Sequence, residues 1–329
     1  MPGAHAKDNR RGARTSISLV AACCLAMLCA GRFQCADELM MVQADAKKGF
    51  HFPYLLKIPK GRQAASFRFL VVEPNNTGFV ADDLAVHISA AKALCQTGTG
   101  SVAAKSLHMP LLVPVFPRPK TDWTIYTHML DRDVMRIREG PLKRLDLQLV
   151  AMVDDAIKRL SRNGSIGKRI LITGFSSSGV FANRFAMLHP DRVLAVACGG
   201  VNGLLMLPLD GLDGKELPYP LGIKDFERIT GAPFDRESWR RVRQYIYMGG
   251  DDANDAVLYD DGYSDAERKT IFAVLGRRMQ PERWHTCRHI YLRAGARATF
   301  RTFAGMGHET NQAVNGEIID FFRTAVDGR

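Results

Sequence analysis

The sequence predicts an α/β protein whose central sheet is mainly parallel and covered by helices on both faces. Apolar runs and helical patterns alternate from about residue 52 to residue 326. The apolar runs are short and continuous, which is typical of strands buried on both faces. The chain has 329 residues, of which 46% are hydrophobic, enough for one large core.

The strands are expected where four to eight apolar residues end at Gly, Pro or a polar turn. These runs lie at residues 52–58, 67–73, 109–116, 169–173, 193–198, 244–248 and 298–303.

Helices are expected between these strands, where apolar residues recur every three or four positions. The segments are residues 82–95, 141–160, 178–188, a stretch beginning near 281, and 313–326. Pro141 suits the first turn of its helix, and Pro190 follows the end of another. Residues 98–100, Gly-Thr-Gly, are expected to form a flexible loop.

The first 36 residues have the layout of a secretory signal peptide. Arg10, Arg11 and Arg14 precede an almost wholly apolar run at residues 16–30, and small residues then lead to Ala36. The apolar run is short for a membrane span. We therefore expect export to a periplasmic or secreted location, with membrane contact only through this leader. An uncleaved anchor, or a lipoprotein modified at Cys23, is the alternative.

Residues 37–329 are expected to form a single domain. Within it, residues 200–243 are rich in Gly, Pro and Leu and too long for a simple connection. We interpret them as an insertion or lid after the sixth strand, near the carboxyl ends of the strands, where such sheets place their sites.

Charge and cysteine content exclude some classes. The net charge of +11 is scattered, without a dense Lys/Arg tract interleaved with aromatics, so nucleic acid is not an expected partner. Four of the seven cysteines fall in the leader. Cys95, Cys198 and Cys287 remain, which leaves room for one disulfide but not for a disulfide scaffold.

A strand, a sharp turn and a helix are expected to meet at Ser176. In such a turn a nucleophilic serine has a strained backbone, so the residues two positions away on each side must be small. Gly174 and Ser178 meet this requirement. Centring the turn on either following serine would place a bulky side chain, Phe175 or Val180, at such a position. The alternative is a serine that only caps the helix.

The sequence around this turn resembles bacterial members of the α/β-hydrolase superfamily related to polyhydroxyalkanoate depolymerases and feruloyl esterases. The similar segments are GFSSSGVFANRFA at 174–186, HPDRV at 189–193, PNNTG at 74–78 and PVFPRP at 114–119. The resemblance covers residues 48–325 and implies that fold. It departs from the G-x-S-x-G pattern, because Ser178 stands where the second glycine is usual.

The resemblance also implies an acid and a base that follow the serine in the chain. The acid of the family follows the glycine at a strand end by three positions, which selects Asp252 from Gly249. Asp251 and Asp255 are alternatives, as is an aspartate that only forms a turn. His308 ends a glycine turn after a later strand, where the superfamily has its base.

Acyl transfer needs two N–H donors for the developing oxyanion. One is expected from the backbone of Ser177, directly after the nucleophile at a helix N-terminus. The other is expected from the loop after the second strand, through the backbone of Asn75 or Asn76. Relatives carry His-Gly in that loop, and here an Asn-rich turn replaces it.

The implied activity is that of an exported serine hydrolase that cleaves a carboxylic ester, small or polymeric, through an acyl-enzyme. No metal and no organic cofactor are implied. A peptidase or amidase with the same triad is one alternative, and a non-catalytic binding protein of the same fold is another.

Two further groups of residues are less specific. His285, Cys287 and His289 resemble a metal cluster, but their spacing also suits one helix without a ligand. Trp123 and Tyr126 are equally suited to line a substrate cleft and to pack in the core or on the surface.

Overall fold

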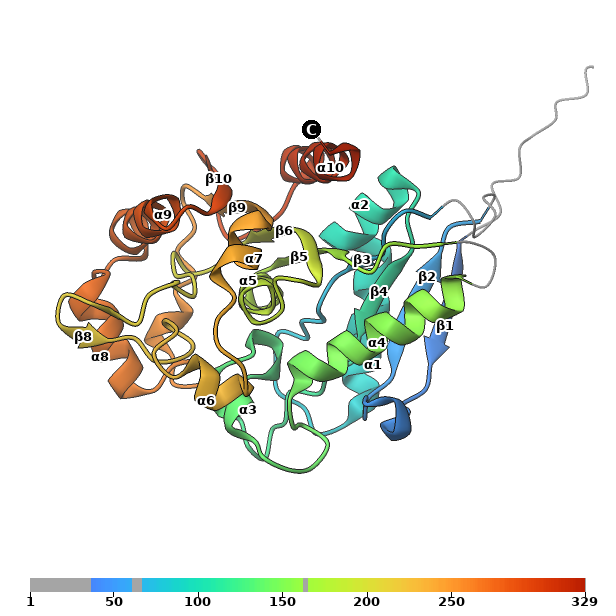
Figure 1. Ribbon diagram of the computed structural model, residues 1–329, viewed down its shortest axis with the longest axis horizontal. Helices are drawn as coiled ribbons and strands as arrows, with labels where there is room; N and C mark the ends of the chain where they lie inside the picture. The colour runs from blue at the N-terminus through green and yellow to red at the C-terminus, as the bar shows by residue number, and fades with distance from the viewer. Residues whose placement is uncertain (1–36, 61–66, 162–164, 329) are drawn as a thin grey trace, which may run out of the picture. The chain divides into compact units, whose positions relative to one another are not determined.

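The core of the protein is an eight-stranded sheet with the order β1-β2-β4-β3-β5-β6-β9-β10 in the part of the chain that the structure describes (Figure 1). The structure is a computed structural model that describes residues 37–60, 67–161 and 165–328. The strand β2 pairs antiparallel with both β1 and β4, and every later pairing is parallel. The predicted α/β class with a mainly parallel sheet is therefore confirmed.

The strands of this sheet are short and mostly buried. They are β1 (Glu38–Val42), β2 (Tyr54–Ile58), β3 (Val71–Val72), β4 (Leu111–Pro114), β5 (Ile170–Phe175), β6 (Val193–Gly199), β9 (Arg243–Gly249) and β10 (Arg297–Phe303). A separate hairpin joins β7 (Gly211–Leu212) to β8 (Lys215–Glu216).

Helices cover both faces of the sheet (Figure 1). The helices α1 (Leu84–Thr97), α2 (Thr99–Leu107) and α10 (Gln312–Asp327) pack on one face. The helices α4 (Leu145–Leu160), α5 (Ser177–Leu188) and α9 (Trp284–Arg293) pack on the other. Side chains alternate between the two clusters along β5, as the period of two requires: Ile170 and Ile172 join one, and Leu171 joins the other. The shorter helices are α3 (Arg132–Arg136), α6 (Phe226–Thr230), α7 (Arg236–Arg241) and α8 (Asp265–Val274).

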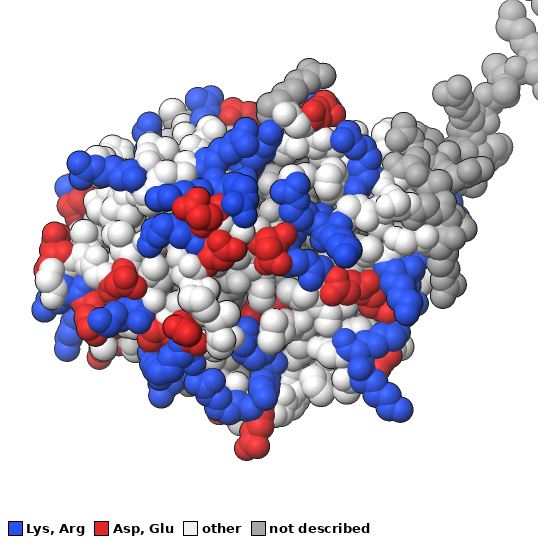
Figure 2. Space-filling model, in the orientation of Figure 1, with Lys and Arg blue, Asp and Glu red and all other residues white. Residues whose placement is uncertain are grey.

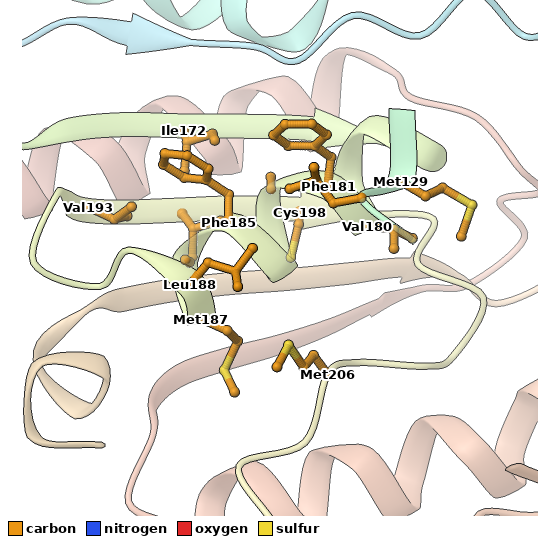
Figure 3. Close-up of a cluster of buried hydrophobic side chains, with 14 of the residues drawn as sticks. Met129, Ile172, Val180, Phe181, Phe185, Met187, Leu188, Val193, Cys198 and Met206 are labelled. Carbon is orange, nitrogen blue, oxygen red and sulfur yellow. The ribbon is translucent and has the colours of Figure 1, made fainter. Parts of the chain in front are cut away.

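The helix α5 is the most enclosed of these elements, since each of its residues is buried. Figure 3 shows its side chains Phe181 and Phe185 packed near Ile172 of β5 and Val193 of β6. Truncating such an aromatic residue to alanine would cost about 3–5 kcal/mol. This packing fixes the helix whose first turn follows Ser176.

The helix α2 corrects one expectation, because it begins at Thr99, inside the segment expected to be a flexible loop. The glycines there serve close packing. A Cβ atom at Gly98 or Gly100 would lie within 3 Å of the Glu73 side chain, and the Gly100 N–H donates to Glu73 Oε2 at 2.9 Å. Small residues were needed because a buried carboxylate approaches the backbone.

Two further boundaries differ from the prediction. The helix α4 begins at Leu145 rather than at Pro141, because Arg144 has a left-handed backbone with φ of 48°. The strand β1 was not predicted. It is a short edge strand in which Leu39 and Met41 are exposed, so it lacks an alternating pattern.

The segment that follows β6 contains the β7–β8 hairpin, α6 and α7 before the chain enters β9. Hydrogen bonds and an ion pair hold this segment against three helices. The N–H of Met206 donates to Asn183 Oδ1 at 3.0 Å, its carbonyl accepts from Tyr291 at 2.7 Å, and Arg132 pairs with Asp225 at 2.7 Å. These contacts hold the segment against α5, α9 and α3.

The three cysteines of the described chain are free and buried, so the disulfide for which the sequence left room does not form among them. Burial raises the pKa of the Cys198 thiol to about 12, which keeps it protonated.

Neither the signal peptide expected at residues 1–36 nor its cysteines belong to the described residues. No helix in the described ranges combines the length and apolar character needed to cross a membrane.

Candidate active site

The turn between β5 and α5 places Ser176 in a strained conformation, with φ of 61° and ψ of −132°. Its N–H donates to the Gly199 carbonyl of β6 at 2.9 Å, which ties the turn to the neighbouring strand. A Cβ atom at Gly174 would lie 2.3 Å from the Ser178 carbonyl oxygen. The turn therefore requires glycine at that position, as the size argument from the sequence predicts.

The hydroxyl of Ser178 explains why a serine can replace the second glycine. Its Oγ donates to the Phe175 carbonyl at 2.8 Å and accepts from the Phe175 N–H at 3.0 Å. The next residue, Gly179, lies so close to β6 that a Cβ atom there would be 2.5 Å from the Gly199 carbonyl oxygen. Ser178 therefore closes the turn with its side chain, and Gly179 provides the close helix–strand contact.

The carboxylate of Asp252 contacts the imidazole of His308, with 2.9 Å between Oδ2 and Nδ1. The Asp252 side chain is 1% exposed and that of His308 is 24% exposed, so the acid is enclosed while the histidine reaches the surface. The His308 ring also lies against Phe175, with 4.6 Å between ring centroids. Phe175 directly precedes Ser176.

Backbone contacts between two loops set this pair in place. The N–H of Asp251 donates to the Met306 carbonyl at 2.9 Å, and that of Gly250 donates to the Phe303 carbonyl at 2.7 Å. A Cβ atom at Gly249 would lie 2.2 Å from the Met306 carbonyl oxygen. Glycine at this position thus lets the loop that carries Asp252 approach the loop that carries His308.

The alternative aspartates have other surroundings. Asp255 forms an ion pair with the buried Arg283 at 2.5 Å and accepts from the Val257 N–H at 3.2 Å. Asp251 is exposed. Of the three aspartates, Asp252 is the one that the structure brings to His308.

The other ring nitrogen of His308 has a different neighbour. Its Nε2 atom lies 3.1 Å from the side-chain Nδ2 of Asn254. In the described part of the chain, no hydrogen bond joins the Ser176 hydroxyl to His308. The structure thus brings Asp252 and His308 together, and Phe175, which precedes Ser176, packs against His308.

A cleft of about 390 Å³ opens at Ser176. It receives side chains from the turn, from the Asn-rich loop after β3, from the Pro-rich loop after β4 and from the loop after β9. From the segment expected to be an insertion or lid, Asn202 is the residue that lines it. The lining residues are Asn76, Gly78, Arg118, Tyr126, Met129, Ser176, Ser177, Asn202, Asn254, Ala256, Tyr259 and Asp261.

The residues expected to form the oxyanion hole divide into two kinds. Ser177 and Asn76 line the cleft. Asn75 is buried and anchors its loop, because its side chain donates to the Phe116 carbonyl at 2.9 Å and accepts from the Phe116 N–H at 3.0 Å. The Asn76 side chain accepts from the Gly78 N–H at 3.0 Å and so shapes the turn. Of the two asparagines, Asn76 is the one that lines the cleft.

The cleft also contains Tyr126, for which the sequence left a cleft position open, and Arg118, which the sequence did not single out. Arg118 is only 5% exposed, donates to Asp261 at 2.6 Å, and lies over the Tyr126 ring at 3.5 Å from its centroid. The Tyr126 hydroxyl is 3.0 Å from Ser177 Oγ. Arg118 belongs to the PVFPRP segment, but nothing in the sequence indicated its partner. Trp123 is exposed and is not among the cleft residues.

Among the described residues, no three His, Cys, Asp or Glu side chains form a group that could hold a metal ion. His285 and His289 line a surface depression with Arg288 and Leu292, whereas Cys287 is buried. On the face shown in Figure 2, acidic side chains lie among the basic ones over most of the surface.

Comparison with known proteins identifies similar solved structures. No family model matches the chain, and no curated protein matches it. Among solved structures, poly(aspartic acid) hydrolase-1 from Sphingomonas sp. KT-1 is similar with a TM-score of 0.53 and 16% identity, over 89% of this chain and 97% of that one. An S-formylglutathione hydrolase from Agrobacterium tumefaciens has a TM-score of 0.48 and 14% identity, over 88% and 94% of the two chains.

A third similar structure is MGS-M1, an α/β hydrolase enzyme from a Medee basin deep-sea metagenome library, with a TM-score of 0.47 and 11% identity, over 89% of this chain and 99% of that one. The likeness to poly(aspartic acid) hydrolase-1, with a TM-score above 0.5 and low identity, indicates a shared fold alone. In this chain that fold is the mainly parallel eight-stranded sheet described above. This chain therefore has the fold of the α/β-hydrolase superfamily, as its sequence predicts.

Proposed function

We propose that the protein is a serine hydrolase that cleaves a carboxylic ester through an acyl-enzyme, with Ser176 as nucleophile, His308 as base and Asp252 as orienting acid. The observation that carries the proposal is the strained backbone of Ser176 in a cleft, beside a histidine that a buried aspartate holds. Non-glycine residues rarely adopt such a conformation unless the surrounding structure enforces it, and such strain gathers at functional sites.

In the first step, His308 Nε2 takes the proton of the Ser176 hydroxyl while Oγ attacks the carbonyl carbon. The Asp252 carboxylate accepts from Nδ1–H, which fixes the tautomer and stabilises the imidazolium that forms. The alcohol then leaves with the proton from His308. Water repeats the sequence on the acyl-enzyme, and the acid and free Ser176 result.

The tetrahedral intermediate carries a negative oxygen, which needs donors already in place. Ser177 is the first residue of α5, so its N–H lies at the positive end of a helix. The second donor in this proposal is the N–H of Asn76, from the loop after β3, which also lines the cleft. Removing one such donor costs about 10²–10³ in turnover in other hydrolases.

The test combines substrate turnover with covalent labelling. Ser176→Ala should reduce the hydrolysis of short-chain esters by roughly three or more orders of magnitude while the fold is retained by circular dichroism. A fluorophosphonate probe should modify Ser176, as mapped by mass spectrometry. The exposed Ser165 provides a control, since Ser165→Ala should leave turnover and labelling intact. Full activity of Ser176→Ala, or an adduct on another serine, would refute the assignment.

The bond type is tested with matched substrates. Esters, polyesters and amides of the same acyl group should be compared on the purified protein, with esters expected to react fastest. Poly(aspartic acid) belongs in the panel, because a similar structure is named as its hydrolase. Faster cleavage of amides would replace the esterase proposal with an amidase on the same residues.

We further propose that the protein is exported and loses residues 1–36. The proposal rests on the basic start, the apolar run at 16–30 and the small residues before Ala36. N-terminal sequencing of the protein from its native host tests it. A start at Asp37 is expected, an intact Met1 on cytosolic protein would contradict export, and a lipid-modified Cys23 would replace free secretion with anchoring.

A further inference from the structure

Arg118 is the one cationic side chain among the described residues that line the cleft. It is 5% exposed, and its Nη2 atom donates to Asp261 Oδ2 at 2.6 Å. Its guanidinium carbon lies over the Tyr126 ring, 3.5 Å from the centroid. The aromatic ring and the Asp261 carboxylate together hold this arginine in place.

Two of the three nitrogens of this guanidinium donate to no described residue. Nε is buried and out of reach of a ligand in the cleft, whereas Nη1 is not enclosed and is open to it. A hydrogen bond from a charged donor stabilises a complex more than one between neutral groups. A ligand in the cleft that presents an oxygen to Nη1 of Arg118 would supply such an acceptor.

The charge of the cleft decides what kind of acceptor fits. Asp261 offsets the positive charge of Arg118, and no further Lys, Arg, Asp or Glu lines the cleft within the described ranges. The nearby Asp252 adds a negative charge below His308. A second carboxylate brought by the ligand would meet these two acids, whereas a neutral carbonyl oxygen would not.

The position of Arg118 relates it to the reacting atoms. Tyr126 connects the two, because its ring carries the guanidinium and its hydroxyl lies 3.0 Å from Ser177 Oγ. Arg118 and Ser176 line the same cleft, so one ligand can contact both.

We propose that Arg118 binds an uncharged carbonyl oxygen of the substrate, distinct from the carbonyl that Ser176 attacks, and so selects substrates with a second ester or amide group. This inference rests on the proposed function. It assigns the protein to oligomeric or doubly esterified substrates rather than to simple fatty esters. Arg118 is a specificity residue in this role, since it contacts the substrate away from the bond that breaks.

Three esters of matched length provide the test, one monoester and two diesters. Methyl hexanoate has one carbonyl, dimethyl succinate has a second carbonyl on the acyl side, and methoxycarbonylmethyl butanoate has it on the alcohol side. Hydrolysis is followed by titration at constant pH, with products identified by chromatography. One of the two diesters should exceed methyl hexanoate in kcat/KM by about tenfold or more, as one added hydrogen bond allows.

The variant Arg118→Met should reduce that preference to near unity, mainly by slowing the diester. The ratio of two substrates on one preparation is independent of how much protein is folded. Because methionine would leave Asp261 unpaired, the double variant Arg118→Met/Asp261→Asn should be measured as well, with the same result expected. Arg132 is the matched control, because it also pairs with an aspartate, Asp225, at 2.7 Å but does not line the cleft. Arg132→Met should keep the wild-type ratio.

An unchanged ratio in both Arg118 variants would overturn the inference. So would a wild-type preference for monomethyl succinate over both diesters, since that result would mean an anion site. These failures are distinct from failure of the proposed function, in which Ser176→Ala would retain turnover of every ester, methyl hexanoate included.

Discussion

The side-chain nitrogen of Asn254 lies 3.1 Å from Nε2 of His308, the atom that accepts the proton of Ser176 in the proposed mechanism. His308 Nδ1 faces Asp252 at 2.9 Å, so in the neutral ring Nδ1 carries the proton and Nε2 is the acceptor. Asn254 then donates to Nε2. The backbone N–H of Asn254 in turn donates to Asp252 Oδ1 at 2.9 Å, which holds the asparagine in this place. Asn254 therefore occupies the base nitrogen in the free protein.

We predict that Asn254→Ala speeds the reaction of Ser176 with a fluorophosphonate. Removing the amide frees Nε2, and one neutral hydrogen bond corresponds to a change of roughly two- to tenfold in rate. The second-order labelling rate measures the effect without substrate binding. Asn254→Asp should instead slow the labelling, because a carboxylate beside Nε2 favours a proton on that nitrogen. Slower labelling in Asn254→Ala would show that the amide supports the base instead of competing with the serine.

We expect Gly249→Ala to lower turnover by about 10² or more, because a misplacement of about 1 Å can cost that much. The added Cβ atom would lie 2.2 Å from the Met306 carbonyl and would push the Asp252 loop away from the His308 loop. Gly316 is the matched control, since a Cβ atom there meets nothing within 4 Å. Ester turnover and thermal unfolding should be measured together. Equal activity in the two variants would mean that the contact between the loops does not position the acid.

The parts of this site that the sequence predicted depend on residues close together in the chain. The turn at Ser176 could be recognised because Gly174 and Ser178 lie two positions away, where steric limits act. Asp252 could be selected because the resemblance implies an acid three positions after the glycine at the strand end, and Gly249 is that glycine. Local patterns of this kind are present in the sequence itself.

The parts that the sequence did not predict depend on contacts between distant residues. Arg118 and Asp261 are separated by 143 positions, and no local pattern links them. In the sequence, Gly100 suggested a flexible loop. In the structure, the absence of a side chain at Gly100 lets the backbone lie close to Glu73, 27 positions earlier. A glycine that permits a close contact and a glycine that permits a flexible turn look alike until the fold is known.

The last prediction concerns Glu73, a fully buried carboxyl group at the end of β3, just before the loop that carries Asn76. Burial raises its pKa from the usual 4.5 to about 7, although hydrogen bonds from Gly100 and Thr99 act in the opposite direction. Between pH 4.5 and 7 the folded protein therefore holds a proton on Glu73 that the unfolded chain has released. Raising the pH through this window lowers the free energy of unfolding, by an amount that corresponds to about 3 kcal/mol.

Glu73→Gln should remove this part of the pH dependence, because glutamine stays neutral and its carbonyl oxygen can still accept from the Gly100 N–H. The measurement is urea unfolding at pH 5 and pH 8, in which the wild type should lose more stability than the variant between the two values. Asp131, whose pKa burial also raises to about 7, will leave a residual decline in Glu73→Gln. The exposed Glu139 serves as control, since Glu139→Gln should keep the full wild-type decline. If Glu73→Gln loses as much stability as the wild type does, Glu73 is already ionised in the folded protein at pH 5, and the burial argument fails.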